Sequence, residues 1–271
     1  MTKSIRMMEQ NIKLVDAVIY VLDARAVSSS INPYFEDIIK DKKRLYVINK
    51  SDLADAAVNT LWLKYFTRKG DAAVLCDGRN IKGAKEIITK LNMLLSDKKQ
   101  AYLQKGVNLP LRAMVIGIPN SGKSTIINTL GREKKAQTGN IAGVTRGKQW
   151  IKLSSGIELL DTPGTLWNAF EKEQTGLNLA FVGSIKEEVT DTEEVAVNLL
   201  KQLSILYPKL LRQKYGIKTD DCADNMLNEI CIKKGCMIKG EADTLRAAKA
   251  VLDDFKKGRI GKISLESPEN A

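Results

Sequence analysis

The segment from Arg112 to Leu130 restricts the possible folds of this chain more than any other, because it has the pattern of a strand, a glycine-rich turn and a helix in direct succession. An apolar run meets Gly117, and the turn follows the spacing Gly-x-x-x-x-Gly-Lys-Ser up to Ser124. This pattern is typical of a phosphate-binding loop, in which glycines let successive N–H groups point into one concavity at a helix N-terminus. The alternative is a structural turn that ends in Lys-Ser by coincidence, and the flanking strand and helix patterns favour the binding loop.

The side chains of this loop indicate how it would hold a polyphosphate. Lys123 supplies a point charge for the outer phosphates, and the hydroxyl of Ser124 is placed to bind Mg²⁺. Backbone N–H groups of the turn would contact the phosphates as well. The nucleotide-binding residues predicted in this loop are Asn120, Ser121, Gly122, Lys123, Ser124 and Thr125.

A second polar segment, Asn49-Lys50-Ser51-Asp52, follows the apolar run Leu45 to Ile48. Nucleotide sites of doubly wound sheets form at such strand ends. The Asp52 carboxylate can accept hydrogen bonds from N1–H and the N2 amino group of guanine, a pair that adenine lacks, so such a site could reject adenine by roughly 10⁴-fold. Asn49 can brace neighbouring loops, and the stem of Lys50 can lie against the base. Alone the tetrapeptide is only a polar strand end, but beside a phosphate loop it predicts a guanine site.

The segment Asp161-Thr162-Pro163-Gly164 follows another apolar run. Asp161 can reach Mg²⁺ through a water molecule, and Gly164 can offer a backbone N–H to the terminal phosphate and pivot when that phosphate leaves. Thr145 lies in the preceding polar loop and is expected to give Mg²⁺ a second hydroxyl, the alternative being a loop threonine without a role.

Apolar runs alternate with helical spacing over residues 1–174, which predicts an α/β fold with a doubly wound, mostly parallel sheet. From about residue 175 the spacing becomes helical, which predicts a small all-α C-terminal domain over residues 175–263. Residues 264–271 are expected to form a frayed tail. No apolar run is long enough to span a membrane, and the first residues carry no apolar secretory core, so a cytoplasmic location is expected.

The distribution of charge points to a polyanionic partner. The net charge is +11, and residues 1–174 hold 28 Lys and Arg against 17 Asp and Glu, whereas residues 175–271 hold 15 of each. Nucleic acid is a better match than a membrane surface for such a chain. The bases of the second part gather late, and Lys256 and Lys257 among them are expected to contact RNA.

Histidine is absent from the sequence, and the four cysteines form no Cys-x-x-Cys pair. These two facts argue against a zinc site and favour reduced thiols. The absence of histidine also removes catalytic triads and the usual imidazole general base.

The order of the motifs resembles that of circularly permuted GTPases, since the guanine motif precedes the phosphate loop, whereas it comes last in ordinary small GTPases. The chain is most similar to the bacterial ribosome biogenesis GTPase A family, and the similarity extends over nearly its whole length. The matching stretches are Asp23-Ala24-Arg25, the Ser-Ser-x-Asn-Pro stretch at 29–33, residues 49–52, 117–125, 143–145 and 161–164, and Ile232 to Cys236.

The resemblance implies a circularly permuted P-loop GTPase domain at 1–174, a helical RNA- and ribosome-binding domain at 175–263 and a tail at 264–271. It implies GTP, GDP and Mg²⁺ as ligands, hydrolysis of GTP to GDP and phosphate, and a switch role in late assembly of the large ribosomal subunit. The expected partners are the precursor of that subunit and its rRNA, with no membrane and no DNA. Permutation joins the mobile Asp-x-x-Gly segment directly to the C-terminal helices, which suits a switch that grips RNA in the GTP state.

The sequence departs from the family pattern around catalysis. The place of the water-orienting Gln after Asp-x-x-Gly holds Thr165, followed by apolar residues. Members usually begin with an aromatic–Pro–Gly–His–Met stretch that carries a proposed catalytic His, and this chain starts at what resembles that Met, so either upstream residues are missing from the sequence or the protein lacks this His. Cys76-Asp77-Gly78 replaces a Ser-Ala-like base-contacting segment.

These departures leave the catalytic residue unassigned and predict a weak intrinsic rate that the ribosome stimulates. Asn120 resembles the position that helps bind K⁺ in related enzymes, an unremarkable turn residue being the alternative. Two other functions stay open at this point. One is a GTP-binding RNA scaffold with negligible turnover, and the other is a permuted GTPase that acts on another RNA.

Overall fold

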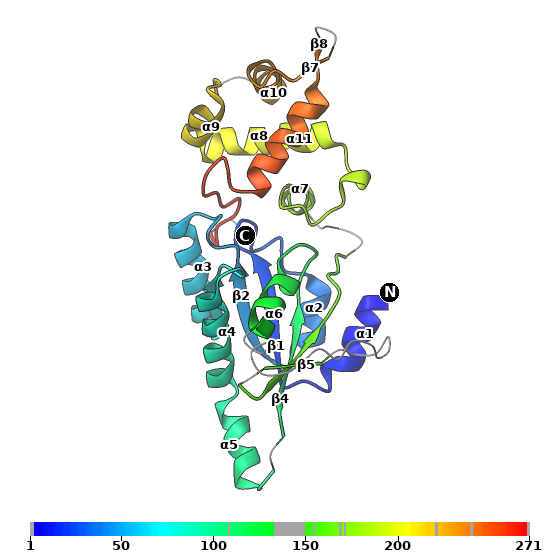
Figure 1. Cartoon of the computed structure of the whole chain (residues 1–271), viewed down its shortest axis with the longest axis vertical. Helices are drawn as coiled ribbons and strands as arrows, with labels where there is room; N and C mark the ends of the chain where they lie inside the picture. The colour runs from blue at the N-terminus through cyan, green and yellow to red at the C-terminus, as the bar shows by residue number, and fades with distance from the viewer. Residues whose placement is uncertain are drawn as a thin grey trace.

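The computed structural model describes residues 3–107, 109–132, 150–153, 155–167, 170, 172–219, 222–238 and 241–269. An α/β domain forms the lower part of the molecule, and a helical domain lies over one end of its sheet (Figure 1). The strands of the α/β domain are β1 (Ala17–Asp23), β2 (Lys43–Asn49), β3 (Ala72–Cys76), β4 (Leu111–Ile116), β5 (Trp150–Lys152) and β6 (Ile157–Asp161). Its helices are α1 (Lys3–Ile12), α2 (Pro33–Ile39), α3 (Ala56–Arg68), α4 (Ile81–Leu94), α5 (Ser96–Gln104) and α6 (Lys123–Arg132).

The strands form one sheet in the order β3-β2-β1-β4-β6-β5, parallel throughout except for β5, which is antiparallel to β6. β1 and β4 are therefore direct neighbours, with Ala17 opposite Ala113. The sheet grows from this pair in opposite directions, so the carboxyl ends of β1 and β4 form the switch point at which doubly wound folds bind ligands. The predicted α/β class and mostly parallel sheet are confirmed.

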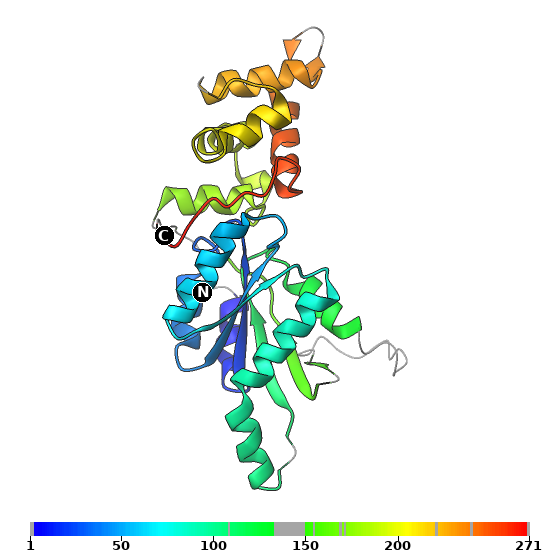
Figure 2. The same ribbon diagram turned by 90° about the vertical axis from the view of Figure 1, so that its left-hand side faces the viewer.

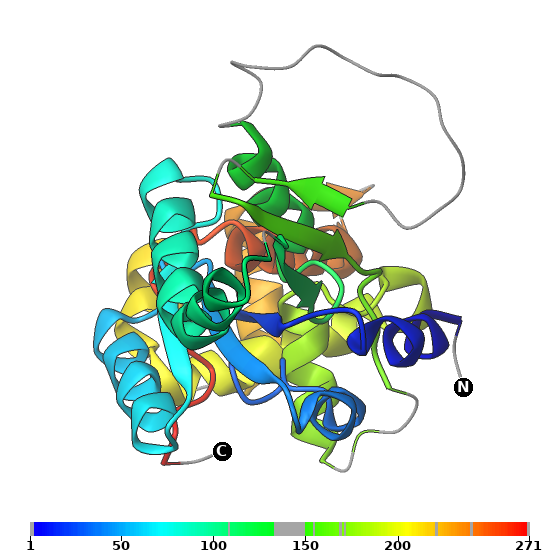
Figure 3. The ribbon, with the colours of Figure 1, turned by 90° about the horizontal axis from the view of Figure 1, so that it is seen from below.

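Helices cover both faces of the sheet, as the view from below shows (Figure 3). Ile19 and Val21 of β1 face a core shared with α4 and α6, whereas Val18, Tyr20 and Leu22 face a core shared with α1, α2 and α3. Successive side chains of a strand point to opposite faces, and with both faces covered every residue of β1 is buried. This explains why the strands appear in the sequence as continuous apolar runs.

The helical domain has a core of its own, to which Leu199, Leu203, Ile230 and Val251 contribute without exposure to solvent. A hairpin of two short strands, each of two residues, lies beside the helices. The domain predicted as all-α therefore also contains a small β element. The elements of this domain are α7 (Glu173–Phe181), the 3₁₀ helix η1 (Glu187–Val189), α8 (Thr192–Leu206), α9 (Pro208–Tyr215), α10 (Ala223–Lys233), β7 (Met237–Ile238), β8 (Glu241–Ala242) and α11 (Thr244–Lys256).

The chain after α11 differs from the frayed tail that the sequence predicted. It returns along the α/β domain (Figure 2), where the N–H of Leu265 donates to the carbonyl of Arg25 at 2.8 Å. The Glu266 carboxylate accepts hydrogen bonds from the N–H of Ser29 at 3.0 Å and from Nδ2 of Asn178 at 2.9 Å. Residues 264–266 therefore hold the two domains together. This role could not be predicted from the sequence, because Arg25, Ser29 and Asn178 lie far from residues 264–266 along the chain.

Among the residues that the structure describes, no helix has both the length and the apolar character needed to cross a lipid bilayer.

Candidate functional site

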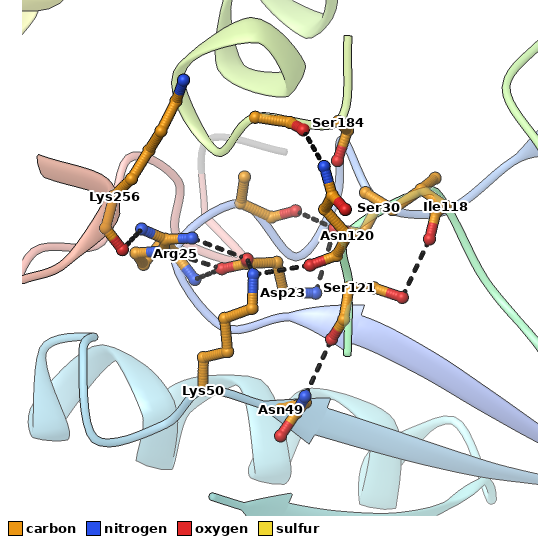
Figure 4. A network of polar contacts seen from close by, with 12 residues as sticks. Asp23, Arg25, Ser30, Asn49, Lys50, Ile118, Asn120, Ser121, Ser184 and Lys256 are labelled. Carbon is orange, nitrogen blue, oxygen red and sulfur yellow. Dashed lines mark hydrogen bonds and ion pairs between the residues drawn. The ribbon is translucent and has the colours of Figure 1, made fainter. Parts of the chain in front are cut away.

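The motifs singled out in the sequence meet at the carboxyl edge of the sheet. Parallel strands end at the same edge, so the segments after β1, β2, β3, β4 and β6 converge there. The helical domain lies over this edge (Figure 1). A close view shows Asp23, Asn49, Lys50, Asn120 and Ser121 joined by hydrogen bonds (Figure 4).

The glycines of the phosphate loop stand where no side chain fits. Gly117 has φ +148°, and a Cβ there would lie 2.4 Å from the carbonyl oxygen of Val21 in β1. Gly122 has φ +97°, and its Cβ would lie 2.2 Å from Nδ2 of Asn49. The loop therefore packs directly against the ends of β1 and β2. Helix α6 begins immediately after the loop, at Lys123. The resulting helix N-terminus is a suitable place for an anion.

Asn49 braces two loops, as its position in the motif predicted. Its Nδ2 donates to the carbonyl of Ser121 at 2.8 Å, and its Oδ1 accepts from the N–H of Gly78 at 2.8 Å. One buried side chain therefore joins the phosphate loop to the segment after β3. The N–H of Ser51 donates to the carbonyl of Cys76 at 3.1 Å and strengthens the same junction.

Lys123 is folded back onto its own loop. Its Nζ donates to the carbonyls of Gly117 at 3.0 Å and Ile118 at 2.8 Å, and the residue is only 6% exposed. Burial lowers the pKa of Lys123 to about 8, although the nearby Asp161 carboxylate opposes the shift. A buried ammonium whose charged form is disfavoured gains strongly from an anion in the loop.

The predicted metal-binding residues are only partly described. Ser124 and Thr125 are exposed on the first turn of α6, and Asp161 is exposed at the end of β6. Thr145 lies outside the described residues. Within the described ranges, no group of three or more Cys, Asp or Glu side chains could hold a metal ion. A hydroxyl, one carboxylate acting through water and the phosphates of a ligand suit Mg²⁺, which retains water and prefers phosphate oxygens.

The Asp-x-x-Gly segment lies directly against the phosphate loop. A Cβ on Gly164 would be 2.8 Å from Nζ of Lys123 and 2.8 Å from Cα of Pro119. The hydroxyl of Thr162 donates to the carbonyl of Val115 at 2.7 Å, which ties the end of β6 to β4. Gly164 is therefore close enough to the loop to meet the outermost phosphate of a bound ligand.

The guanine motif borders a cavity of about 400 Å³ between the two domains. A cavity of about 500 Å³ lies beside it and is lined by Arg25, Lys50 and Asn120 together with residues of the helical domain. Another of about 480 Å³ lies between α5 and the β5–β6 hairpin, and no motif residue lines it. The residues that line the interdomain cavity are Asn49, Lys50, Asp52, Leu53, Asp77, Gly78, Arg79, Gly122, Thr125, Lys256 and Lys257.

The carboxylate of Asp52 is engaged by Arg79, a residue that sequence reasoning missed. Nη2 of Arg79 lies 2.6 Å from Oδ2 of Asp52, and its Nε lies 3.0 Å from Oδ1 of Asp77. The first of these ion pairs holds the group predicted to recognise guanine. The sequence does not indicate this ion pair, because Arg79 lies outside the matching motifs and directly after Cys76-Asp77-Gly78, which departs from the family pattern.

The helical domain also contacts the phosphate loop, which no local pattern predicted. Nδ2 of Asn120 donates to the carbonyl of Gly183 at 2.5 Å, and the hydroxyl of Ser184 donates to the carbonyl of Pro119 at 2.8 Å. Lys256 and Lys257, expected to contact RNA, line the cavity beside the guanine motif. The site is thus built by both domains.

Comparisons with known proteins agree with this arrangement. The family model described as a 50S ribosome-binding GTPase matches residues 112–226. Ribosome biogenesis GTPase A of Priestia megaterium is 39% identical over 276 residues, covering 100% of this chain and 96% of that protein. The protein of the same name from Bacillus cereus is 38% identical, and the match covers 99% of this chain and 92% of that protein. The crystal structure of GNP-bound YlqF from T. maritima has a TM-score of 0.72 and 25% identity, with 100% of both chains covered.

Proposed function

The chain belongs to the ribosome biogenesis GTPase A family, and from this premise we propose that it binds GTP at the carboxyl edge of its sheet and hydrolyses it as a switch in late assembly of the large ribosomal subunit. The observation that carries the proposal is the meeting of Asp52, the phosphate loop and Asp161 at one edge, although the chain visits them in permuted order. Precursor large subunits with their rRNA are the proposed partners, and the cytoplasm is the proposed location.

Each binding residue has a role that its chemistry supports. Asp52 accepts from guanine, with Asn49, Lys50 and Ser51 holding the segment in place. Lys123 and the N–H groups of residues 120–125 neutralise the phosphates. Gly164 offers its N–H to the terminal phosphate. Ser124, with Asp161 through water and Thr145 outside the described residues, would hold Mg²⁺, which supplies charge stabilisation when bound.

Next to Gly164, the described residues supply little to activate the attacking water. The position after Gly164 holds Thr165, which is buried and whose carbonyl accepts from Nδ2 of Asn32 at 3.3 Å, followed by Leu166 and Trp167. Slow intrinsic hydrolysis that the ribosome accelerates is therefore the proposed behaviour. The same residues favour the second candidate function, a GTP-binding scaffold with negligible turnover.

Phosphate release separates these functions. We expect slow release by the protein alone and faster release with large ribosomal subunits, measured in K⁺ and in Na⁺ because Asn120 is a proposed K⁺ ligand. Gly164→Ala is the matched control, since its added Cβ collides with Pro119 and should block release while GDP still binds. No release with subunits would support the scaffold. Acceleration only by small subunits or tRNA would support action on another RNA.

Nucleotide binding should depend on pH through Lys123. Its pKa is about 8 in the free protein, and a polyphosphate beside it favours the ammonium form and raises that pKa. Binding therefore takes up about half a proton at pH 8 and close to one near pH 9, and affinity falls as pH rises. Calorimetry in two buffers of different ionisation enthalpy measures this uptake. Lys123→Arg, whose guanidinium stays protonated, should remove it, and equal uptake by both proteins would contradict the prediction.

Removing Arg79 should strengthen nucleotide binding. Its guanidinium must leave the Asp52 carboxylate when guanine N1–H and N2 occupy it. The pair is partly exposed and contributes up to about 1 kcal/mol, so Arg79→Ala should lower the Kd for GDP by roughly 2- to 5-fold. The Kd of Arg79→Lys for GDP, measured by calorimetry, should lie between those of the wild-type protein and Arg79→Ala. Weaker binding by Arg79→Ala would mean that the guanidinium contacts the nucleotide instead.

A further inference from the structure

A buried carboxylate at the end of β1 holds two cations at once. Asp23 is 1% exposed, and its oxygens accept from Nε of Arg25 at 2.9 Å, from Nη2 of Arg25 at 2.8 Å and from Nζ of Lys50 at 2.8 Å (Figure 4). Burial alone would raise the pKa of Asp23, but the two cations hold it well below its ordinary value. The carboxylate therefore stays ionised and keeps both partners.

Lys50 connects this carboxylate to the nucleotide site. The same Nζ that bonds Asp23 also donates to the carbonyl of Asn120 at 2.6 Å, so the side chain stretches from the end of β1 to the phosphate loop. Lys50 lines the cavity beside Asp52 and also the cavity that Arg25 and Asn120 line. Lys50 has a positive φ of 58°, a conformation that few residues other than glycine adopt. The aliphatic stem is thus held at the place where a base would lie.

Arg25 connects the carboxylate to the helical domain. Its Nη1 donates to the carbonyls of Phe255 at 3.3 Å and Lys256 at 3.2 Å, in the last turn of α11. The carbonyl of Phe255 also accepts from the N–H of Gly258 at 3.0 Å. Carbonyls of a last turn carry the negative end of the helix dipole, so they favour a cation. The guanidinium also lies 5.2 Å from the centre of the Phe255 ring, and Arg25 is only 2% exposed.

The three ionised groups leave one positive charge uncompensated, since two cations share one carboxylate. An excess charge of this kind is costly to bury unless something nearby offsets it. Solvent offsets part of this charge, because the Lys50 side chain is 24% exposed, and Glu187 and Glu188 line the same cavity as Arg25 and Lys50. The carbonyl end of α11 accepts from Arg25, and the carbonyl of Asn120 in the phosphate loop accepts from Lys50. A nucleotide in that loop adds negative charge beside Lys50 and the carbonyl of Asn120.

We propose that Asp23 and Arg25 are positioning residues that fix Lys50 over the guanine cavity and tie it to the carboxyl end of α11. Occupancy of the nucleotide site and docking of the helical domain then favour each other, and this coupling acts equally in both directions. This connection between the nucleotide site and the helical domain, called the relay below, runs from Lys50 through Asp23 and Arg25 to α11. It is separate from the covalent connection that leads from the Asp-x-x-Gly segment to α7. The inference rests on the proposed function, since a guanine nucleotide must be the ligand.

A double-mutant cycle tests the relay. Arg25→Gln should raise the Kd for GDP by about 5- to 20-fold when Lys50 is present, and by less than about 2-fold in the Lys50→Met protein. A merely structural role of Arg25 would raise the Kd equally in both proteins and overturn the proposal. Arg44→Gln is the matched control, because Arg44 forms ion pairs with Glu36 and Asp71 away from the site and should leave the Kd unchanged.

Hydrogen exchange at the end of α11 gives an independent readout. GDP should slow exchange of the amides of Lys257, Gly258 and Arg259 by roughly 10-fold in the wild-type protein, but not in Lys50→Met at saturating GDP. This comparison decides the matter even if Arg25→Gln does not fold. A wild-type protein that binds GDP without this slowing overturns the relay alone. A wild-type protein that binds no GDP overturns the proposed function.

Discussion

Replacement of Asp52 by Asn will exchange guanine for xanthine nucleotides as the preferred ligands. The carboxylate accepts from N1–H and the N2 amino group of guanine, and each such charge-assisted bond contributes about 1.5 to 3 kcal/mol. Asn keeps one acceptor oxygen but loses the charge and turns an NH₂ group toward the N2 amino group, so the Kd for GDP should rise by roughly 10²- to 10⁴-fold. Xanthine presents an oxygen where guanine has its N2 amino group, and the amide of Asn can donate to that oxygen. Calorimetric titration with GDP and with xanthosine diphosphate measures the exchange.

Asp77→Asn is the matched control for this exchange. Asp77 lines the same cavity and pairs with the same Arg79, through Nε at 3.0 Å. It lies outside the Asn-Lys-Ser-Asp motif, so its amide variant should keep the preference for guanine. If Asp52→Asn bound GDP as tightly as the wild-type protein, the assignment of Asp52 would be wrong.

The second large effect concerns Lys123, whose replacement by Met should abolish function while stabilising the free protein. Without its charge the outer phosphates lose a charge-assisted contact, and the Kd for GTP should rise by roughly 10- to 100-fold. Phosphate release should fall further, by roughly 10²- to 10³-fold, because the charge also stabilises the transition state. Fluorescent-nucleotide titration and phosphate-release assays measure the two losses.

The gain in stability follows from the burial of Lys123. A fall in its pKa from 10.5 to about 8 corresponds to about 3 kcal/mol of unfavourable burial of the charged form. The unfolded chain keeps this proton up to its ordinary pKa, so the free protein becomes more stable as pH rises from about 8 toward 10. At pH 7 Lys123→Met should raise the free energy of unfolding by about 1 to 3 kcal/mol.

Lys42→Met serves as the control for that measurement. Nζ of Lys42 also donates to a backbone carbonyl, that of Val15 at 2.9 Å, but Lys42 lies outside the site. Its replacement should not stabilise the protein and should not change nucleotide affinity. A Lys123→Met protein less stable than wild type in urea unfolding would contradict the expected gain.

The sheet and the nucleotide motifs were predictable because their signals are local. Strands buried on both faces must be apolar at every position, as Val18 to Leu22 are. The phosphate loop needs glycine at 117 and 122, because a Cβ there would lie 2.4 Å from the carbonyl oxygen of Val21 and 2.2 Å from Nδ2 of Asn49. Both requirements restrict the residues next to one another in the chain, so the sequence alone predicts the edge of the sheet at which the motifs meet.

Other features leave no local mark. Helix α5 leaves no helical pattern in the sequence, because it has no buried residue and therefore no apolar stripe. Lys256 and Lys257 appear in the sequence as part of a basic cluster, yet they line the cavity beside Asp52. That placement depends on how α11 docks on the α/β domain, and contacts between residues so far apart in the chain cannot be inferred from composition or spacing.

The returning segment at 264–266 affects how the helical domain can move. One attachment is the covalent connection ahead of α7, and the other is the set of contacts that Leu265 and Glu266 make with Arg25 and Ser29. Hydrogen bonds of Asn120, Ser184 and Arg25 also join the domains. When these side-chain contacts open, the two attachments remain, and a rigid body held at two places can turn easily only about the line that joins them. The helical domain should therefore rock about a single axis rather than swing in all directions, and a nucleotide-driven displacement would carry a ribosomal partner along one defined arc.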